Sequence, residues 1–245
     1  MTASGPLLLA GTGAARRLAA RLVEAGVRPL ASLAGATTTP AAYPCEARVG
    51  GFGGAEGLAD WIRAHGPLAV VDATHPYAVR ISANAAAACA ATGAPYLRLD
   101  RPPWTRRPGE RWIEARDLEG AVAALPPGAR AFAATGRSSA EAFAARPDIW
   151  VALRVVDPPD APYPGAGEYV VARPPFDEAA ERALLHGLGI THLVVKNAGG
   201  AAARTKLDAA ASLGLPIVVV ARPPEPPGPA FDADEIVARL AAAAR

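Results

Sequence analysis

One stretch in the first half of the chain constrains the fold most, because it joins a buried strand to a helix through a turn crowded with polar groups. The apolar run at residues 68–71 predicts a short buried strand that stops at Asp72. Pro76 begins a long Ala-rich helical pattern that ends at Gly93, and proline suits the start of a helix. The polar residues that share this turn are Asp72, Thr74, His75 and Tyr77.

The same order of strand, turn and helix recurs along the chain, which predicts an α/β fold with parallel, doubly wound sheets. Ligands bind at the carboxyl ends of the strands in such sheets. Two more polar turns of this kind lie at Thr135-Gly136-Arg137 and at Lys196-Asn197. We expect a first domain at residues 1–102 and a second at residues 103–245, facing each other across a cleft. The last helix, at residues 232–243, follows a Pro-rich linker that would permit its return to the first domain.

Composition excludes several classes of protein. The chain has 245 residues, 51% of them hydrophobic, and a net charge of only +2 with scattered arginines, which argues against nucleic acid as the main partner. No apolar run approaches the length of a membrane span, and the N-terminal residues do not resemble a signal peptide. Cys45 and Cys89 sit in no metal or redox spacing. We therefore expect a cytoplasmic protein without a metal site.

The first turn of the chain favours an anion. A predicted strand at residues 6–10 leads into Gly11, Thr12 and Gly13, and a helical pattern follows. Backbone N–H groups at such a helix start attract phosphate. Arg16 occupies the place of the third glycine in the dinucleotide fingerprint. This stretch predicts nucleotide binding, with an ordinary tight turn as the alternative.

The second predicted strand, at residues 29–33, bears on the choice of nucleotide. NAD-binding folds place an acidic residue near this point to hold the ribose hydroxyls, but none lies between Glu24 and Glu46. The hydroxyls of Ser32 and Thr37 could bond a phosphate instead. If a dinucleotide binds, this pattern favours NADPH over NADH; otherwise the segment is a polar loop.

A third turn is unusually rich in glycine. Residues 50–54 contain four glycines in five positions and follow Arg48. Such a run indicates unusual backbone angles or the close approach of a ligand.

Basic and titratable groups supply the candidate chemistry. Lys196 and Lys206 are the only lysines among 25 basic residues, and a chain that otherwise uses arginine can retain lysine where a compact ammonium is needed. Lys196 could hold an anion or donate a proton at a pKa lowered by burial. Arg137 follows a glycine at a predicted helix start, where its guanidinium is well placed to bind a carboxylate or a phosphate. His75 is a candidate site residue, while Asp72 could equally cap the turn or the helix.

The arrangement of these groups favours a cofactor-using reductase or a transferase over a hydrolase. The sequence has no Ser-His-Asp order with the serine on a nucleophile elbow, as a hydrolase of that type would need. It also has no residues at metal-ligand spacing.

Taken together, six blocks of sequence resemble the precorrin-6A reductase family of cobalamin biosynthesis. The most distinctive are Asp72-Ala73-Thr74-His75-Pro76 and Lys196-Asn197-Ala198-Gly199-Gly200. The others lie at residues 9–16, 32–35, 48–54 and 135–137.

The resemblance implies an NADPH-dependent enzyme with two Rossmann-like domains, which reduces a C=C bond of precorrin-6A to give precorrin-6B. It places the cofactor over Gly11, Thr12, Gly13 and Ser32, with its nicotinamide reaching the cleft beside Thr135, Gly136, Arg137 and Lys196. Tyr77, His75 or a water would provide the proton, with Lys196 a third catalytic candidate. The residues expected to contact the tetrapyrrole or hold its carboxylates are Asp72, Thr74, Arg80, Arg137, Lys196, Asn197, Gly199, Gly200, Arg204 and Lys206.

Three departures from the family pattern affect these expectations. Ala10 replaces the first glycine of the first turn, and Ala198 replaces a serine. Ala36 stands where relatives often carry arginine, so the 2′-phosphate contact would fall to Ser32, Thr37 or Arg16.

Three other readings compete with this one. The substrate could be the cobalt-bearing ring, which would make the protein a cobalt-precorrin-6A reductase. The chain could be a non-catalytic module that binds NADPH without oxidising it. A methyltransferase would bind S-adenosylmethionine, but usually has an acidic residue after its second strand, which is missing here.

Overall fold

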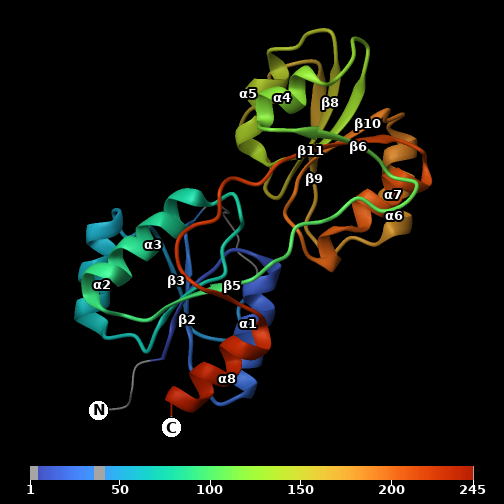
Figure 1. Cartoon of the computed structure of the whole chain (residues 1–245). Helices are drawn as coiled ribbons and strands as arrows, with labels where there is room; N and C mark the ends of the chain where they lie inside the picture. The colour runs from blue at the N-terminus through green and yellow to red at the C-terminus, as the bar shows by residue number, and fades with distance from the viewer. Residues whose placement is uncertain (1–4, 36–41, 245) are drawn as a thin grey trace. The chain divides into compact units, whose positions relative to one another are not determined.

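The computed structural model describes residues 5–35 and 42–244, so the candidate Thr37 lies outside the described residues (Figure 1). The chain divides into two compact units. The first comprises Met1–Arg101 and Pro223–Arg245, and the second comprises Pro102–Arg222.

The first unit is built on a six-stranded, all-parallel sheet in the order β12-β5-β4-β1-β2-β3. Its strands are β1 (Leu7–Leu9), β2 (Leu30–Leu33), β3 (Ala47–Val49), β4 (Val70–Asp72), β5 (Tyr96–Leu99) and β12 (Ala230–Phe231). Its helices are α1 (Gly13–Glu24), α2 (Ala55–His65), α3 (Val79–Thr92) and α8 (Ala233–Ala243).

Helices cover both faces of this sheet, which explains why β1 is apolar at every position. Leu8 packs with α1 and α8 on one face, whereas Leu7 and Leu9 pack with α2 and α3 on the other. Strands buried on both faces carry continuous rather than alternating apolar residues. The three consecutive leucines therefore define the centre of the first unit.

The second unit contains another six-stranded, all-parallel sheet, in the order β6-β11-β10-β7-β8-β9. Its strands are β6 (Arg111–Ala115), β7 (Arg130–Ala134), β8 (Trp150–Val155), β9 (Gly167–Val171), β10 (His192–Lys196) and β11 (Pro216–Val220). Its helices are α4 (Leu118–Ala123), α5 (Ala140–Ala144), α6 (Glu178–Gly187) and α7 (Thr205–Ser212), with 3-10 turns η1 (Arg137–Ser139) and η2 (Ala201–Ala203). The predicted α/β class with two parallel sheets is confirmed.

Strand order reverses at the middle of each sheet. In the first unit β1 lies between β2 and β4, and in the second β7 lies between β8 and β10. Neighbouring connections leave in opposite directions at such a switch point and open a crevice beyond the carboxyl ends of the strands. The turns after β1, β4, β7 and β10, singled out by sequence, therefore lie at the two switch points.

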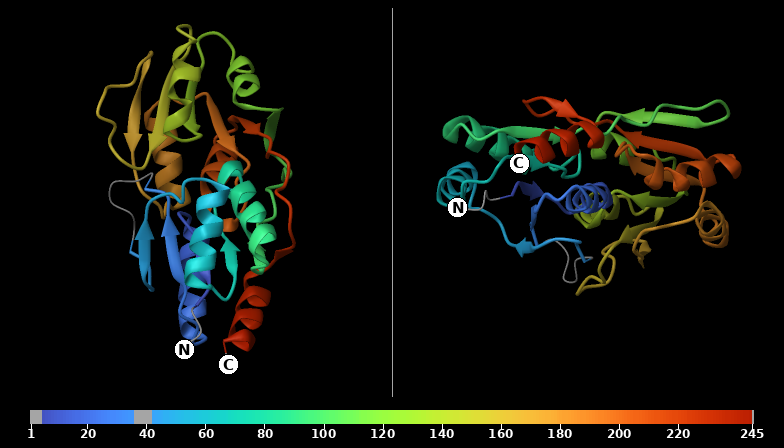
Figure 2. Two further views of the ribbon diagram at one scale, coloured as in Figure 1. Left: turned by 90° about the vertical axis from the view of Figure 1, so that its left-hand side faces the viewer. Right: turned by 90° about the horizontal axis from the view of Figure 1, so that it is seen from below.

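The C-terminal segment differs from the expected domain at residues 103–245. Residues 223–245 belong to the first unit, where β12 extends the sheet beside β5 and α8 packs beside α1 (Figures 1 and 2). Ile236 and Leu240 of α8 are buried against the apolar face of α1. The return is favoured because it pairs the open edge of β5 and covers apolar surface that would otherwise meet water.

Some local expectations also need correction. The helix after β4 begins at Val79 rather than at Pro76, because residues 73–78 form an extended polar turn. Its end at Gly93 agrees, with that glycine in the left-handed conformation. The sequence reading missed β3, β6 and β12, whose residues are partly or fully exposed at most positions and lack an apolar run.

None of the helices among the described residues has the length and apolar character needed to cross a membrane.

Replacing Ile236 with alanine should test the packing of α8. Ile236 is fully buried against α1, so Ile236→Ala should lower the free energy of unfolding by about 2–4 kcal/mol in urea denaturation. Val23→Ala provides the control, because Val23 of α1 is exposed and its truncation should cost well under half as much. Equal effects of the two variants would contradict the packing of α8 on α1.

Candidate functional site

The turn after β1 is held by Thr12, which caps α1. The Thr12 hydroxyl accepts a hydrogen bond from the Ala15 N–H at 3.0 Å and donates one to the Ala73 carbonyl at 2.9 Å. It thereby ties the start of α1 to the end of β4. Gly11 has a φ of +106°, a conformation that favours glycine. Its N–H donates to the Tyr43 hydroxyl at 3.1 Å.

Positive charge gathers beside the start of α1. A methyl group added at Gly13 would lie 3.6 Å from Nη1 of Arg17 and 4.0 Å from Nη2 of Arg16. The N–H groups of Gly13 and Ala14 belong to the first helical turn, where amides have no intrahelical acceptor. Exposed glycines, first-turn amides and two guanidinium groups fit a diphosphate. A nucleotide cofactor is therefore compatible with this turn.

Ser32 is the penultimate residue of β2, beside this turn, and its side chain contacts Arg48, which was not among the residues predicted for the site. The Ser32 side chain is buried, and its hydroxyl accepts a hydrogen bond from Nη1 of Arg48 at 2.7 Å. Arg48 lies on β3, directly opposite Ser32. The position of Arg48 just before the glycine-rich residues 50–54 could have identified it as a site residue. The strand that carries Arg48, β3, has no apolar pattern and was not predicted.

Asp72 stabilises the turn after β4. Its Oδ1 accepts hydrogen bonds from the Thr74 N–H at 3.0 Å and the Thr74 hydroxyl at 2.6 Å, and Oδ2 accepts one from the Tyr96 hydroxyl at 2.9 Å. The residue is only 6% exposed. Of the two roles left open by sequence, Asp72 therefore caps the turn. Burial raises the pKa of Tyr96, and the nearby negative charge of Asp72 raises it further, so the Tyr96 hydroxyl remains a hydrogen-bond donor.

His75 and Tyr77 lie on the turn that Asp72 supports. The Tyr77 N–H donates to Nδ1 of His75 at 3.3 Å, and the ring centroids are 5.5 Å apart. With Nδ1 accepting, the neutral imidazole carries its proton on Nε2. Both side chains are half-buried, and Arg80 is exposed in the first turn of α3.

The turn after β7 combines a buried hydroxyl pair with an exposed arginine. Thr135 is 2% exposed, and its hydroxyl shares a 2.6 Å hydrogen bond with Ser139, which in turn donates to the Gly136 carbonyl. Thr135 thus shapes the turn from inside. Gly136 has a φ of +91°, and Arg137 is exposed at the start of η1.

The turn after β10 begins at Lys196, the last residue of that strand. Burial lowers the pKa of Lys196 from its ordinary value. The Asn197 side chain accepts from the Trp104 N–H at 2.8 Å and donates to the Trp104 carbonyl at 3.0 Å. A side chain at Gly199 would collide with the Pro102 carbonyl oxygen, 2.2 Å from an added methyl group. Asn197 and Gly199 therefore hold residues 102–104 against this turn.

Gly200 participates in the same attachment, since its carbonyl accepts from Nε1 of Trp104 at 2.8 Å. Arg222 fixes the other side of the turn by donating to the carbonyls of Asn197 and Ala198.

Two cations proposed for substrate carboxylates lie largely inside the second unit. Arg204 is 5% exposed and pairs with Glu110 and, at 3.2 Å, with Asp208. The Lys206 ammonium donates to the Ala203 carbonyl. Burial lowers the pKa of Lys206 to about 8, and of the two charges near it Glu181 raises that pKa and Arg154 lowers it.

A buried ion pair adjoins Lys206 and was not foreseen from sequence. Nη1 of Arg154 on β8 lies 2.5 Å from Oε1 of Glu181 on α6. The rings of Phe132 and Phe176 flank the guanidinium, with centroids 4.6 and 4.2 Å from its Cζ. An arginine inside the apolar strand at residues 150–155 was the only signal. Its carboxylate partner is distant in sequence.

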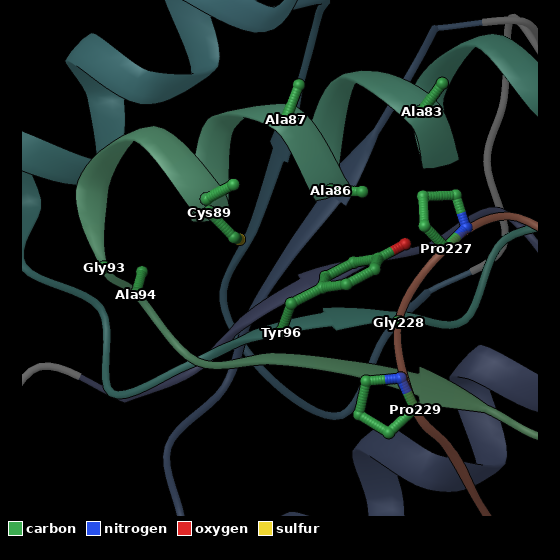
Figure 3. Close-up of a pocket in the computed structure, with 11 residues that line it drawn as sticks. Ala83, Ala86, Ala87, Cys89, Gly93, Ala94, Tyr96, Pro227, Gly228 and Pro229 are labelled. Atoms are coloured by element: carbon green, nitrogen blue, oxygen red, sulfur yellow. The ribbon is translucent and has the colours of Figure 1, made fainter.

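A cavity of about 660 Å³ lies between α3 and the segment that returns to the first unit (Figure 3). Alanines of α3 line it together with Cys89, Tyr96, Pro227 and Pro229, and none of the predicted site residues does. The lining carries no charged side chain, so it offers no grip for a polyanionic ligand. Within residues 5–35 and 42–244, no three His, Cys, Asp or Glu side chains group to hold a metal ion.

The lowered pKa of Lys206 predicts a pH dependence of stability. Because the folded-state pKa, about 8, lies below the ordinary 10.5, the folded chain binds fewer protons than the unfolded chain between these values. Stability should therefore rise with pH in this window and fall as pH drops through 8. Between pH 7 and 9.5, the unfolding free energy of the wild type should gain about 1–2 kcal/mol relative to Lys206→Met. Urea denaturation followed by tryptophan fluorescence would measure this gain, and a pH-independent difference would contradict the prediction.

Comparison with known proteins places this geometry in a family. The family model described as precorrin-6x reductase CbiJ/CobK matches residues 7–242. A precorrin-6A reductase from Rhodobacter capsulatus is 47% identical over 222 residues, which cover 90% of this chain and 88% of that protein. A cobalt-precorrin-6A reductase from Priestia megaterium is 29% identical over 229 residues, covering 89% and 90%.

A solved structure titled CobK precorrin-6A reductase superimposes with a TM-score of 0.94 at 44% identity, covering 98% of this chain and 97% of that one. The match with the family model over nearly the whole chain confirms the resemblance found in the sequence. The chain belongs to the precorrin-6x reductase family, CbiJ/CobK.

Proposed function

We propose that the protein is an NADPH-dependent precorrin-6A reductase, which reduces a C=C bond of the macrocycle to give precorrin-6B in cobalamin biosynthesis. The observation that carries this proposal is the 47% identity to a precorrin-6A reductase across 90% of the chain. Family membership also weighs against a methyltransferase.

The choice between the metal-free and the cobalt-bearing ring rests on the same comparison. The chain is 43–47% identical to proteins named precorrin-6A reductase, but only 27–29% identical to those named cobalt-precorrin-6A reductase. The metal-free ring is therefore the favoured substrate.

The turn after β1 would hold the cofactor. First-turn amides and the guanidinium groups of Arg16 and Arg17 beside Gly13 suit its diphosphate. Gly11 and Gly13 are exposed and have no side chain to block a close approach. When bound, the reduced nicotinamide supplies a hydride.

Exposed cations would hold the carboxylates of the tetrapyrrole as charge-assisted pairs. Arg80 at the start of α3 and Arg137 at the start of η1 are the exposed members of the predicted set. Arg204 is less suited, because it already pairs with Glu110 and Asp208 inside the second unit.

Saturation of a C=C bond also needs a proton, for which Lys196, His75 and Tyr77 remain the candidates. Burial lowers the pKa of Lys196, so its ammonium releases a proton more readily than an exposed lysine. An acid whose pKa lies closer to the operating pH is the more effective catalyst. The Nε2 proton of His75 and the hydroxyl of Tyr77 are alternative sources.

An anaerobic assay with precorrin-6A and NADPH should test the activity. We expect NADPH absorbance to fall together with a shift of the macrocycle bands. If only the cobalt-bearing ring reacts, the substrate is cobalt-precorrin-6A rather than precorrin-6A. NADPH binding without oxidation of the cofactor on either ring would indicate a non-catalytic module.

Lys196→Met should separate catalysis from cofactor binding. We expect kcat to fall by about 10²–10⁴-fold, as for loss of a general acid, while the Kd for NADPH changes less than about twofold. Lys196→Arg keeps the positive charge but cannot readily release a proton, so recovery of kcat in this variant would indicate anion binding instead. Equal losses in kcat and NADPH affinity in Lys196→Met would refute the assignment.

A further inference from the structure

Arg48 and Ser32 form a preorganised cationic group beside the turn after β1. Ser32 lies opposite Leu9 of β1 on one side and opposite Arg48 of β3 on the other. The Ser32 carbonyl accepts a hydrogen bond from the Ala10 N–H at 3.0 Å. The Arg48–Ser32 pair therefore lies next to Gly11, the first residue of the turn that is proposed to bind the diphosphate.

Four contacts hold the Arg48 guanidinium in one orientation. Nη1 donates to the Ser32 hydroxyl at 2.7 Å and to the Gly50 carbonyl at 3.0 Å, and Nη2 donates to the Gly51 carbonyl at 3.4 Å. Its Cζ lies 4.1 Å from the centroid of the Phe52 ring. The glycine-rich segment after β3 thus wraps the arginine side chain.

The charge of this group has no carboxylate partner within the described part of the chain. Among the described residues, Arg48 contacts only neutral oxygens and an aromatic ring. The sequence contains no acidic residue from 25 to 45. These contacts occupy three of the five N–H donors of a guanidinium. A half-buried cation with spare donors is suited to an external anion.

The position of Arg48 and Ser32 in the fold indicates which anion they would bind. In doubly wound nucleotide-binding folds, the end of the second strand meets the adenosine ribose, where an acidic residue binds the 2′-hydroxyl and an arginine accommodates a 2′-phosphate. Here Ser32 is the penultimate residue of that strand, with Arg48 beside it on β3. Because the Ser32 hydroxyl accepts from Arg48, its own proton is available to a phosphate oxygen.

We propose that Arg48, positioned by Ser32 and Phe52, binds the 2′-phosphate of NADPH and determines the preference for NADPH over NADH. This inference rests on the proposed function, since it requires an NADPH site in the first unit. It assigns to β3 the contact that Ala36 does not supply.

Binding of two nucleotide fragments to the full-length protein tests the proposal without the reaction. Adenosine 2′,5′-bisphosphate and 5′-AMP differ only in the 2′-phosphate, and isothermal titration calorimetry gives the affinity of each. The wild type should prefer the bisphosphate by at least about tenfold. Arg48→Gln should weaken bisphosphate binding by about 10–100-fold, as expected for loss of charge-assisted hydrogen bonds. Its affinity for 5′-AMP should change less than about twofold.

Controls distinguish recognition of the phosphate from support of the fold. Arg63→Gln removes an exposed arginine of α2 that pairs with Asp60, and should change neither affinity. If Arg48→Gln fails to fold, Arg48→Met gives the same comparison, because its unbranched side chain still covers Phe52. Parallel loss of both affinities in the Arg48 variant would show a structural role and overturn the inference.

The outcomes also separate this inference from the proposed function. A wild-type protein that binds both fragments equally, or neither, would argue against NADPH as the cofactor. A wild type that prefers the bisphosphate, together with an Arg48→Gln variant that keeps this preference, would overturn the role of Arg48 and leave the cofactor proposal in place.

Discussion

Parallel pairing on both sides of a buried central strand is the constraint on which the candidate sites depend. β1 carries only leucines and has helices against both of its faces, so polar groups can appear only beyond its end. Because β4 runs parallel beside it, the turns after the two strands meet at one edge. The hydrogen bond from Thr12 to the Ala73 carbonyl then locks these turns together. β7 and β10 repeat this arrangement in the second unit.

Polar residues at these edges divide into those that build the turns and those that remain accessible. Asp72 and Thr135 are almost completely buried, and their oxygens are occupied by neighbouring hydroxyl or amide groups. The Asn197 carboxamide likewise hydrogen-bonds to the N–H and the carbonyl of Trp104. Arg137, by contrast, is exposed on a turn shaped by such groups. Rigid support of this kind is what lets a site position its accessible groups accurately.

Two buried ion pairs lie within the second unit. The Arg154–Glu181 and Arg204–Glu110 pairs are both more than nine-tenths buried. Removing such ions from water has a large desolvation cost, so the pairs are weak evidence for stability, although loss of one partner would be severe. Lys206 lies close enough to the first pair for both charges to influence its pKa. The ammonium therefore belongs to an internal charge network.

The sequence by itself determined the class of fold, the positions of the polar turns and the family. Apolar runs, glycine turns and helical patterns are local signals, and the blocks at residues 72–76 and 196–200 are distinctive. Only the tertiary structure decided that residues 223–245 return to the first unit, that Arg204 pairs internally, and that Arg48 adjoins Ser32. These outcomes depend on strand register and on partners distant in the chain. Which oxygen a side chain reaches is set by that packing, and no local pattern of residue types encodes it.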